Sequence, residues 1–406
     1  MKRVYWATLL PCLVVLAFFY VYYEYLNPAE ELGDVRVGFV YKNDESTPDT
    51  YNFSLARDAL EARYGKHVEI LTRSNVQEDQ TEAPLRELVG KGCEIIFFNG
   101  YSEQVPELAA LYPQVQFCQV SYADMTGRAL PENYHTFKGE LYQGRYVSGV
   151  VAGMKLKDMI NREIVDPYRP MVGFVAAYPT PEVISGYTAF LLGVRSVVPN
   201  AVMRVRYTNV WSGYSAEKNA AHALIREGCA IISQHTDTSG PAVACEEARA
   251  SGVVYYIGLN QSTAEVAPSV SLVSVRVNWA PYVTGAVEAV MKHRRIEASV
   301  PGRVHGTDMS AGFDRGWVEM LDLNQRLAPK GTLEAMNAAI DRFRQGGGDF
   351  VFKGDYTGVN PDDPSDTIDL SAGFKENERS SYPAFDYVLK DVVTVDSANS
   401  GGEDAA

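Results

Sequence analysis

Three residues near the middle of the chain, Ser233, His235 and Asp237, are of the types that form a hydrolase triad. They alternate along one predicted strand end, so their side chains point to one face. Same-face neighbours on a strand lie about 6.6 Å apart, whereas triad members contact one another directly. The sequence also has no GxSxG elbow. We therefore expect Asp237 to accept hydrogen bonds from ligand hydroxyls, the alternative being a cap for the helix entered through Gly240.

Motifs for other chemistries are missing from the sequence. The Cys and His residues do not follow CxxC, HxxxH or HExxH spacing, which argues against a metal site. Neither GxxxxGK[ST] nor GxGxxG occurs, which argues against a phosphate loop or a dinucleotide fold. We expect no metal, no cofactor and no catalytic residues.

Further candidate ligand-binding residues lie where predicted strands end. The polar stretch 42–52 offers Asp49 and Asn52 for hydrogen bonds and Tyr51 as a flat stacking surface. Its alternative role is a solvated loop that caps the next helix. The remaining candidates follow other strands: Asn99, Tyr101, Trp211, Asn278 and Trp279. Packing within a lobe is the alternative for both tryptophans.

Strands and helices alternate along the chain, which predicts parallel, doubly wound sheets. Expected strands are 35–41, 67–71, 94–98, 115–120, 171–178, 201–207, 230–234 and 253–259. Expected helices are 55–64, 82–89, 103–111, 183–197, 216–227 and 241–251. Ligands bind such sheets beyond the carboxyl ends of the strands, where the candidates above are found.

The chain also repeats itself. The segment 88–101 (LVGKGCEIIFFNGY) resembles 224–237 (LIREGCAIISQHTD), and the strand 67–71 has its counterpart at the same offset. Two elements at one offset indicate two similar α/β lobes that face each other across a cleft. This architecture predicts binding better than it predicts catalysis.

The N-terminus predicts the compartment. Lys2 and Arg3 precede an uncharged run of about 20 residues, 4–23, which is long enough to span a bilayer as a helix. We expect residues 1–26 to form an uncleaved membrane anchor, with the chain from about Asn27 outside the cytoplasm. Lipidation of Cys12 is a weaker alternative, because Pro11 stands where a small residue is expected.

Charge is distributed unevenly. The net charge of −14 argues against nucleic-acid binding. Residues 349–406 carry 13 acidic and 4 basic residues, so this C-terminal extension holds much of the excess. We expect the extension to pack partly on a lobe and to fray after Asp396.

Four stretches together resemble the basic membrane protein (BMP) family, the substrate-binding proteins of nucleoside-type ABC importers. They are 142–153 (YQGRYVSGVVAG), 172–201 from VGFVAAYP to PNA, 234–237 (QHTD) and 274–282 with its Trp-Ala-Pro-Tyr. The resemblance covers about residues 35–325. It implies a type I periplasmic-binding-protein fold whose hinges lie near residues 122–140, 268–280 and 305–315.

The resemblance also implies roles for single residues. Asp237 matches an acid that hydrogen-bonds ribose, Tyr51 resembles an aromatic that stacks on the base, and Trp211 resembles a cleft aromatic. Gly186 and Val277 depart from the family, which has a second stacking Phe and a Lys at these positions. A nucleobase is therefore expected as readily as a nucleoside.

These observations predict a membrane-tethered, two-lobed solute-binding protein that closes on a purine nucleoside or nucleobase and presents it to an ABC permease. The first lobe is expected to comprise 34–125 and about 275–305, and the second 140–268 and about 310–345. The alternative with the same fold is an extracytoplasmic sensor. An enzyme is disfavoured, because no nucleophile–base pair or metal cluster is found in the sequence.

Overall fold

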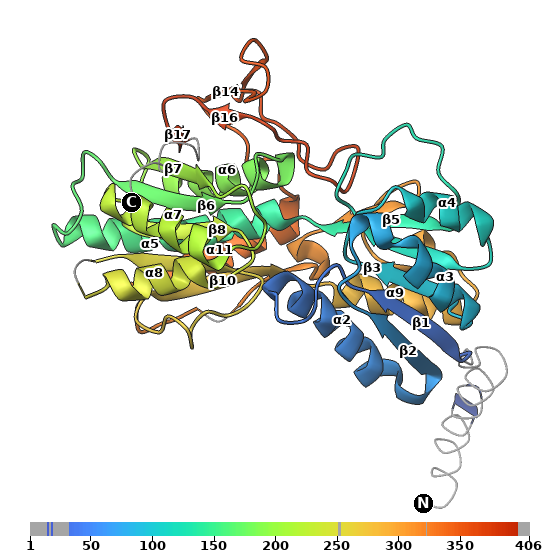
Figure 1. The fold of residues 1–406 in the computed structure, drawn as a ribbon. Coiled ribbons are helices and arrows are strands. Elements are labelled where there is room, and N and C mark those ends of the chain that lie inside the picture. The colour runs from blue at the N-terminus through green and yellow to red at the C-terminus, as the bar shows by residue number, and fades with distance from the viewer. Residues whose placement is uncertain (1–13, 16–17, 19–31, 251–252, 322, 397–406) are drawn as a thin grey trace, which may run out of the picture.

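Two seven-stranded sheets organise the chain into two lobes (Figure 1). The structure is a computed structural model that describes residues 14–15, 18, 32–250, 253–321 and 323–396. In both lobes the central five strands are parallel, and helices cover the sheets. This arrangement confirms the α/β class and the parallel sheets predicted from the sequence.

The first lobe is built on the sheet with strand order β11-β12-β5-β4-β3-β1-β2. Its strands are β1 (Val35–Val40), β2 (Val68–Arg73), β3 (Ile95–Phe98), β4 (Gln116–Val120), β5 (Tyr134–Gly139), β11 (Arg303–His305) and β12 (Asp308–Ala311). Its helices are α2 (Pro48–Tyr64), α3 (Glu82–Gly90), α4 (Gln104–Leu111), α9 (Ala280–Met291) and α10 (Ile296–Ser299). Short 3-10 turns cover Gly65–His67 and Glu78–Gln80.

The second lobe is built on the sheet with strand order β13-β10-β9-β8-β6-β7-β17. Its strands are β6 (Met171–Ala176), β7 (Val202–Tyr207), β8 (Ile231–His235), β9 (Tyr255–Leu259), β10 (Ser271–Val277), β13 (Val318–Met320) and β17 (Val393–Asp396). Its helices are α5 (Leu141–Asn161), α6 (Pro181–Arg195), α7 (Tyr214–Arg226), α8 (Gly240–Ala248) and α11 (Thr332–Gly346). A 3-10 turn covers Phe313–Arg315.

The two lobes repeat one another. The order β2-β1-β3-β4-β5 in the first sheet corresponds to β7-β6-β8-β9-β10 in the second, so the predicted internal repeat is confirmed. The strands β1, β3 and β6 are almost continuously apolar and buried. Parallel strands covered on both faces have this pattern, which is why the sequence revealed them.

The chain passes between the lobes three times, after β5, after β10 and after β12. The expected lobe boundaries differ from the structure by a few residues. All of β10 belongs to the second sheet, although the first lobe was expected to resume at about 275, and β12 ends in the first sheet at Ala311. The chain leaves β10 only after this strand has paired with β9, and it leaves β12 only after this strand has paired with β5.

Helix α2 starts at Pro48, seven residues before the predicted start at Leu55. Pro48 occupies the first turn, where a missing N–H costs nothing, and Asp49 follows it close to the positive end of the helix. The predicted loop 42–52 is therefore helical in its last five residues. This difference decides where Asp49, Tyr51 and Asn52 point.

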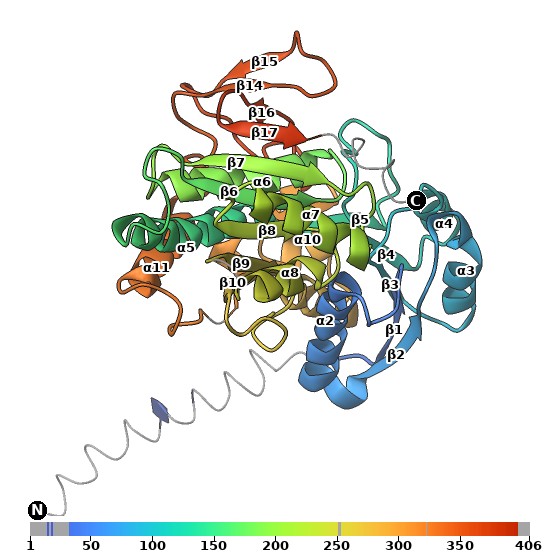
Figure 2. The same ribbon diagram turned by 60° about the vertical axis from the view of Figure 1, so that its left-hand side comes forward.

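The acidic extension lies along the outer side of the second lobe (Figure 2). It forms a three-stranded sheet from β14 (Thr357–Val359), β15 (Thr367–Asp369) and β16 (Val388–Leu389), and β17 then joins β7. Packing on a lobe was expected for this segment. Residues after Asp396 lie outside the described part of the chain.

The predicted anchor, residues 1–26, lies almost entirely outside the described residues; only Val14, Val15 and Phe18 are described. In the part of the chain that the structure describes, no helix is both long enough and apolar enough to cross a membrane. The anchor therefore remains a prediction.

Candidate ligand-binding site

A cavity of about 740 Å³ lies between the two lobes. Its wall includes side chains from the first lobe (Lys42, Asp49, Tyr101, Tyr122, Lys138), from the second lobe (Glu182, Trp211, His235, Asp237, Asn260) and, at Trp279, from the second crossing. Tyr382 of the C-terminal extension also contributes. The volume is in the range of pockets that enclose small molecules.

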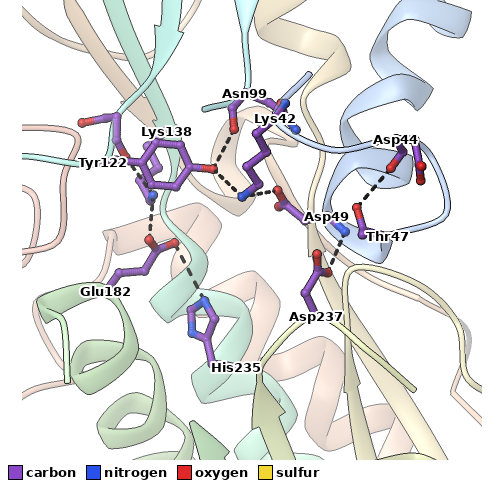
Figure 3. Close-up of polar contacts among 11 residues, drawn as sticks. Lys42, Asp44, Thr47, Asp49, Asn99, Tyr122, Lys138, Glu182, His235 and Asp237 are labelled. Carbon is purple, nitrogen blue, oxygen red and sulfur yellow. Dashed lines mark hydrogen bonds and ion pairs between the residues drawn. The ribbon is translucent and has the colours of Figure 1, made fainter. Parts of the chain in front are cut away.

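Asp237 connects the two lobes at the N-terminus of α2. Its carboxylate Oδ1 accepts a hydrogen bond of 2.8 Å from the backbone N–H of Asp49, in the first turn of α2 (Figure 3). Burial raises the pKa of Asp237 to about 8, and the nearby Asp49 carboxylate adds to this rise. The predicted alternative role, a cap for α8, is not seen: Thr238 Oγ1 accepts the bond from the Gly240 N–H.

Lys42 lies at the end of β1 and pairs with Asp49 across 2.9 Å. Its ammonium group also donates to the Tyr122 hydroxyl at 3.4 Å. Burial opposes the charge on Lys42, but Asp49, Tyr122 and Asp237 together outweigh burial, so the pKa of Lys42 is raised well above its ordinary value. Lys42 is therefore charged, and the Asp49 carboxylate already neutralises its charge.

A second ion pair joins the lobes directly. Lys138, on β5, lies 3.0 Å from Glu182 Oε2, in the first turn of α6 (Figure 3). Lys138 Nζ also donates to the backbone carbonyl of Ser121 at 2.8 Å and lies 4.6 Å from the centroid of the Tyr122 ring. The pair spans the cleft close to the first crossing.

His235 ends β8 next to this pair, with its Nε2 3.9 Å from Glu182 Oε1. Burial, and then the positive charge of Arg145, hold the pKa of His235 well below its ordinary value, so the ring is neutral. Among the described residues its Nδ1 has no hydrogen-bond partner. Trp211 contacts the His235 ring edge to face, at 6.4 Å between centroids, and is itself 43% exposed, which leaves an indole surface for a ligand.

Asp49, Tyr101, Trp211, Asp237 and Trp279 line the cavity as the sequence suggested. The roles of two of them are modest. The Tyr101 hydroxyl donates to Glu103, and Trp279 is largely packed between Phe53 and Phe137, at 5.5 and 5.6 Å between centroids. Packing, the alternative considered for the tryptophans, therefore accounts for much of the Trp279 surface.

The structure places four of the predicted residues outside the cavity wall: Tyr51, Asn52, Asn99 and Asn278. Residues two apart on a helix point in nearly opposite directions, so Asp49 faces the cleft and Tyr51 faces solvent at 43% exposure. Asn52 is buried and donates to the Val277 carbonyl at 3.0 Å. Asn99 Oδ1 accepts from the Lys42 N–H, and Asn278 Oδ1 accepts from the Ala280 N–H. These three side chains brace the backbone around the site.

The sequence analysis missed Lys138, Glu182, Tyr122 and Tyr382 as wall residues. A signal existed for Lys138, since a lysine inside the buried strand YHTFKG needs a partner. Glu182 lies in the first turn of a helix that begins with Pro181 at the carboxyl end of β6, where ligand-facing groups are expected.

Comparison with known proteins identifies the family. The profile of the Bmp family, described as ABC transporter substrate-binding protein PnrA-like, matches residues 47–336. The chain belongs to this family. Proteins of this family bind solutes outside the cytoplasm for ABC importers.

Two curated relatives share extended similarity with the chain. A purine-binding protein of Brucella abortus (strain 2308) is 30% identical over 261 residues, which cover 63% of this chain and 69% of the relative. A putative ABC transporter glucose-binding protein of Haloferax volcanii is 27% identical over 262 residues, or 64% of this chain and 59% of the relative.

Solved structures share the fold. A solute-binding protein of an ABC transporter system from Conexibacter woesei superposes with a TM-score of 0.59 at 19% identity, covering 77% of this chain and 97% of that one. A solute-binding protein from Aeropyrum pernix K1 gives 0.60 at 15% identity, with coverage of 77% and 92%. The fold is therefore that of periplasmic solute-binding proteins, as the resemblance implied.

Proposed function

We propose that this protein binds an unphosphorylated purine nucleoside or nucleobase in the cavity between its lobes and presents it, unchanged, to an ABC permease. The observation that carries the proposal is the charge arrangement of the wall. Of the described side chains that line the cavity, two are lysines, and each already pairs with a carboxylate. Asp237, Glu78 and Asp79 add further acidic groups.

This arrangement disfavours a phosphorylated ligand. A phosphate group requires unpaired cations or a cradle of backbone N–H groups, whereas here it would meet a carboxylate-rich wall. Carboxylates accept hydrogen bonds from ribose hydroxyls and from N–H groups on a base edge. Asp237 is the residue we assign to this task, with Asp49 beside it.

Aromatic surfaces support a planar ligand. Trp211 is half exposed at the cavity wall and stands at 5.5 Å between centroids from Tyr178, so its indole is held in place while one surface stays accessible. A heteroaromatic ring stacks on such a surface, which contributes about 0.5–1.5 kcal/mol beyond the area that it buries. The name of the Brucella relative points to the same ligand class.

Binding without bond-making is the mechanism we propose. Two polar contacts at the cavity cross between the lobes: Lys138 pairs with Glu182, and Asp237 accepts a hydrogen bond from the Asp49 N–H. The Lys42–Asp49 ion pair lies beside the second of these contacts. Closure of the lobes would bring these groups around the ligand, and opening would release it to the permease.

Thermal-shift and calorimetric titration of residues 32–396 with matched compounds test this function. The panel contains adenosine, guanosine, inosine, adenine, guanine, uridine, glucose and GMP, and mass spectrometry identifies any ligand that co-purifies. We expect a purine nucleoside or base to bind at micromolar or lower Kd and GMP to bind at least tenfold more weakly. Stabilisation by GMP but not by guanosine or guanine would overturn the proposal, and tight binding of glucose alone would reassign the ligand.

Anchoring of the chain through residues 4–23 is part of the same proposal. Its support is the length and hydropathy of that run together with the preceding Lys2 and Arg3. Membrane fractionation of the full chain, with and without residues 1–26, tests it. Recovery of both forms in the soluble fraction would contradict the anchor.

A further inference from the structure

The C-terminal extension is built into the second lobe. Its last strand, β17, pairs in parallel with β7, with Val393 opposite Met203. Phe352, Leu370 and Phe385 of the extension are fully buried in the core of that lobe. The extension is therefore a fixed part of the fold, and its interior loops have defined positions.

One loop of the extension, Glu376–Phe385, reaches the first lobe. The backbone N–H of Ser381 donates to Asp308 Oδ2 at 2.6 Å, and Asp308 belongs to β12 of the first sheet. The other oxygen of Asp308 accepts a bond of 2.6 Å from the Thr136 hydroxyl on β5. A loop rooted in the second lobe thus touches the first lobe beside the crossing strand.

Internal bonds hold this loop in shape. The buried carboxylate of Glu376 accepts from Ser185 on α6 at 2.6 Å and from the N–H groups of Ala384 and Phe385 at 3.1 and 2.9 Å. The Asn377 side-chain amide donates to the carbonyls of Ser380 and Ser381. Tyr382 and Pro383, the two residues between the bonded Ser381 and Ala384, are therefore held on both sides.

Tyr382 is the residue that this loop presents to the cavity. It lines the wall together with Lys138 and Glu182, and its ring centroid lies 5.8 Å from Lys138 Nζ. Tyr122 approaches the same ammonium group at 4.6 Å. Lys138 thus lies within reach of two aromatic rings, one from each lobe, and both rings also border the cavity.

We propose that Tyr382 is a ligand-contacting residue, held at the cavity wall by the loop Glu376–Phe385 and its contacts to both lobes. It would supply an aromatic surface and a hydroxyl group to a planar ring ligand. The inference rests on the proposed function, since a purine ring is the ligand that such a surface recognises. The matched family range ends at residue 336, so this contact comes from beyond that range.

The experiment compares Kd for adenine, guanine and their nucleosides in the wild type and in Tyr382→Ala, Tyr382→Leu and Tyr382→Phe. Removing the ring should weaken both bases and nucleosides at least tenfold, whereas Tyr382→Phe should stay within about threefold. Tyr382→Leu keeps much of the side-chain volume, so it tests the ring even where the alanine variant folds poorly. Tyr387→Ala is the matched control, a partly buried tyrosine of the same extension that bonds Asp366 and is not among the wall residues; it should leave Kd within twofold.

The outcomes separate this inference from the proposed function. Wild-type binding of a purine together with unchanged Kd in folded Tyr382→Ala or Tyr382→Leu would overturn the role of Tyr382 and leave the proposed function standing. Equal losses in Tyr382→Ala and Tyr387→Ala would also overturn it, because the effect would then be one of stability. A wild type that binds no purine overturns the proposed function and this inference with it.

Discussion

Asp237 is the residue that we expect to accept hydrogen bonds from the ribose hydroxyls of a nucleoside. At a pH above its pKa of about 8, where Asp237 is ionised, we expect Asp237→Asn to weaken nucleoside binding by about 1.5–3 kcal/mol, the range for hydrogen bonds to a charged group, and to leave binding of the free base nearly unchanged. The asparagine keeps one oxygen for the Asp49 N–H, so the contact between the lobes survives. Calorimetry with guanosine and guanine measures both values. Equal losses for the two ligands would mean that Asp237 orients the base.

Tyr51 and Trp211 have equal exposure, 43%, but only Trp211 lines the cavity. We therefore expect Tyr51→Ala to leave Kd within twofold, with a stability change within about 0.5 kcal/mol, as for other surface substitutions. Trp211→Ala should weaken binding at least tenfold, since a stacking surface and its buried area are both lost. Titration of both variants with the same purine checks this. A large loss in Tyr51→Ala would restore the stacking role that the sequence suggested.

The sequence predicted the position of a single residue only where the neighbouring residues in the chain determine that position. The place of Asp237 in the cavity wall could be predicted because this acid lies two residues after the end of a buried strand. Its partner could not, because the Asp49 N–H lies 188 positions away and on another lobe. The orientation of Tyr51 depended on the start of α2, and an error of seven residues there reversed the face on which it lies.

At the scale of elements, the motif YQGRYVSGVVAG of α5 has a packing explanation. A Cβ at Gly149 would lie 2.1 Å from the Phe190 carbonyl oxygen of α6, and a Cβ at Gly193 would lie equally close to the Tyr146 oxygen of α5. These two glycines let the helices cross backbone to backbone. These glycines, which belong to two of the four stretches that resemble the family, therefore serve the packing of the second lobe.

Gly149→Ala should consequently separate α5 from α6. We expect a loss of about 2–3 kcal/mol or more in the free energy of unfolding, because the added methyl group meets backbone that cannot rotate away. Gly90→Ala is the matched control, at the end of α3 with no atom near the added Cβ, and should be neutral or stabilising by up to about 1 kcal/mol. Urea denaturation of both variants measures the difference. Similar midpoints for the two would refute the close helix crossing.

Strands and helices were predictable because their signals are local. Buried parallel strands appear as unbroken apolar runs, and the repeated order of the two sheets follows from the repeated segments 88–101 and 224–237. The cross-lobe pair Lys138–Glu182 and the placement of Tyr382 arise only after the chain has crossed between lobes. Such contacts depend on how the chain crosses between the lobes, and a single sequence does not specify these crossings in detail.

At the scale of the whole molecule, the extension connects both lobes through a loop whose anchor is ionisable. Burial raises the pKa of Glu376 to about 7, against the hydrogen bonds from Ser185, Ala384 and Phe385, which favour the charged form. The neighbouring Glu140 carboxylate adds a small further rise. A carboxyl group whose pKa is raised by folding keeps its proton in the folded state while the unfolded chain has lost it.

Glu376 should therefore make the folded protein less stable as the pH rises from about 4.5 to about 7, since the folded state binds more protons than the unfolded state in that window. Below the window, Glu376→Gln should have nearly the same stability as the wild type. The free energy of unfolding of Glu376→Gln should exceed that of the wild type by a growing amount through the window, and the difference should level off above pH 7 at a value on the order of 3 kcal/mol.

Taking the difference between variant and wild type removes the contributions of other groups, such as His235, whose lowered pKa acts in the opposite direction. Denaturant titrations at pH 4.5, 5.5, 6.5, 7.5 and 8.5 measure both curves, and a pH-independent difference for Glu376→Gln would show that the loop opens its anchor to water.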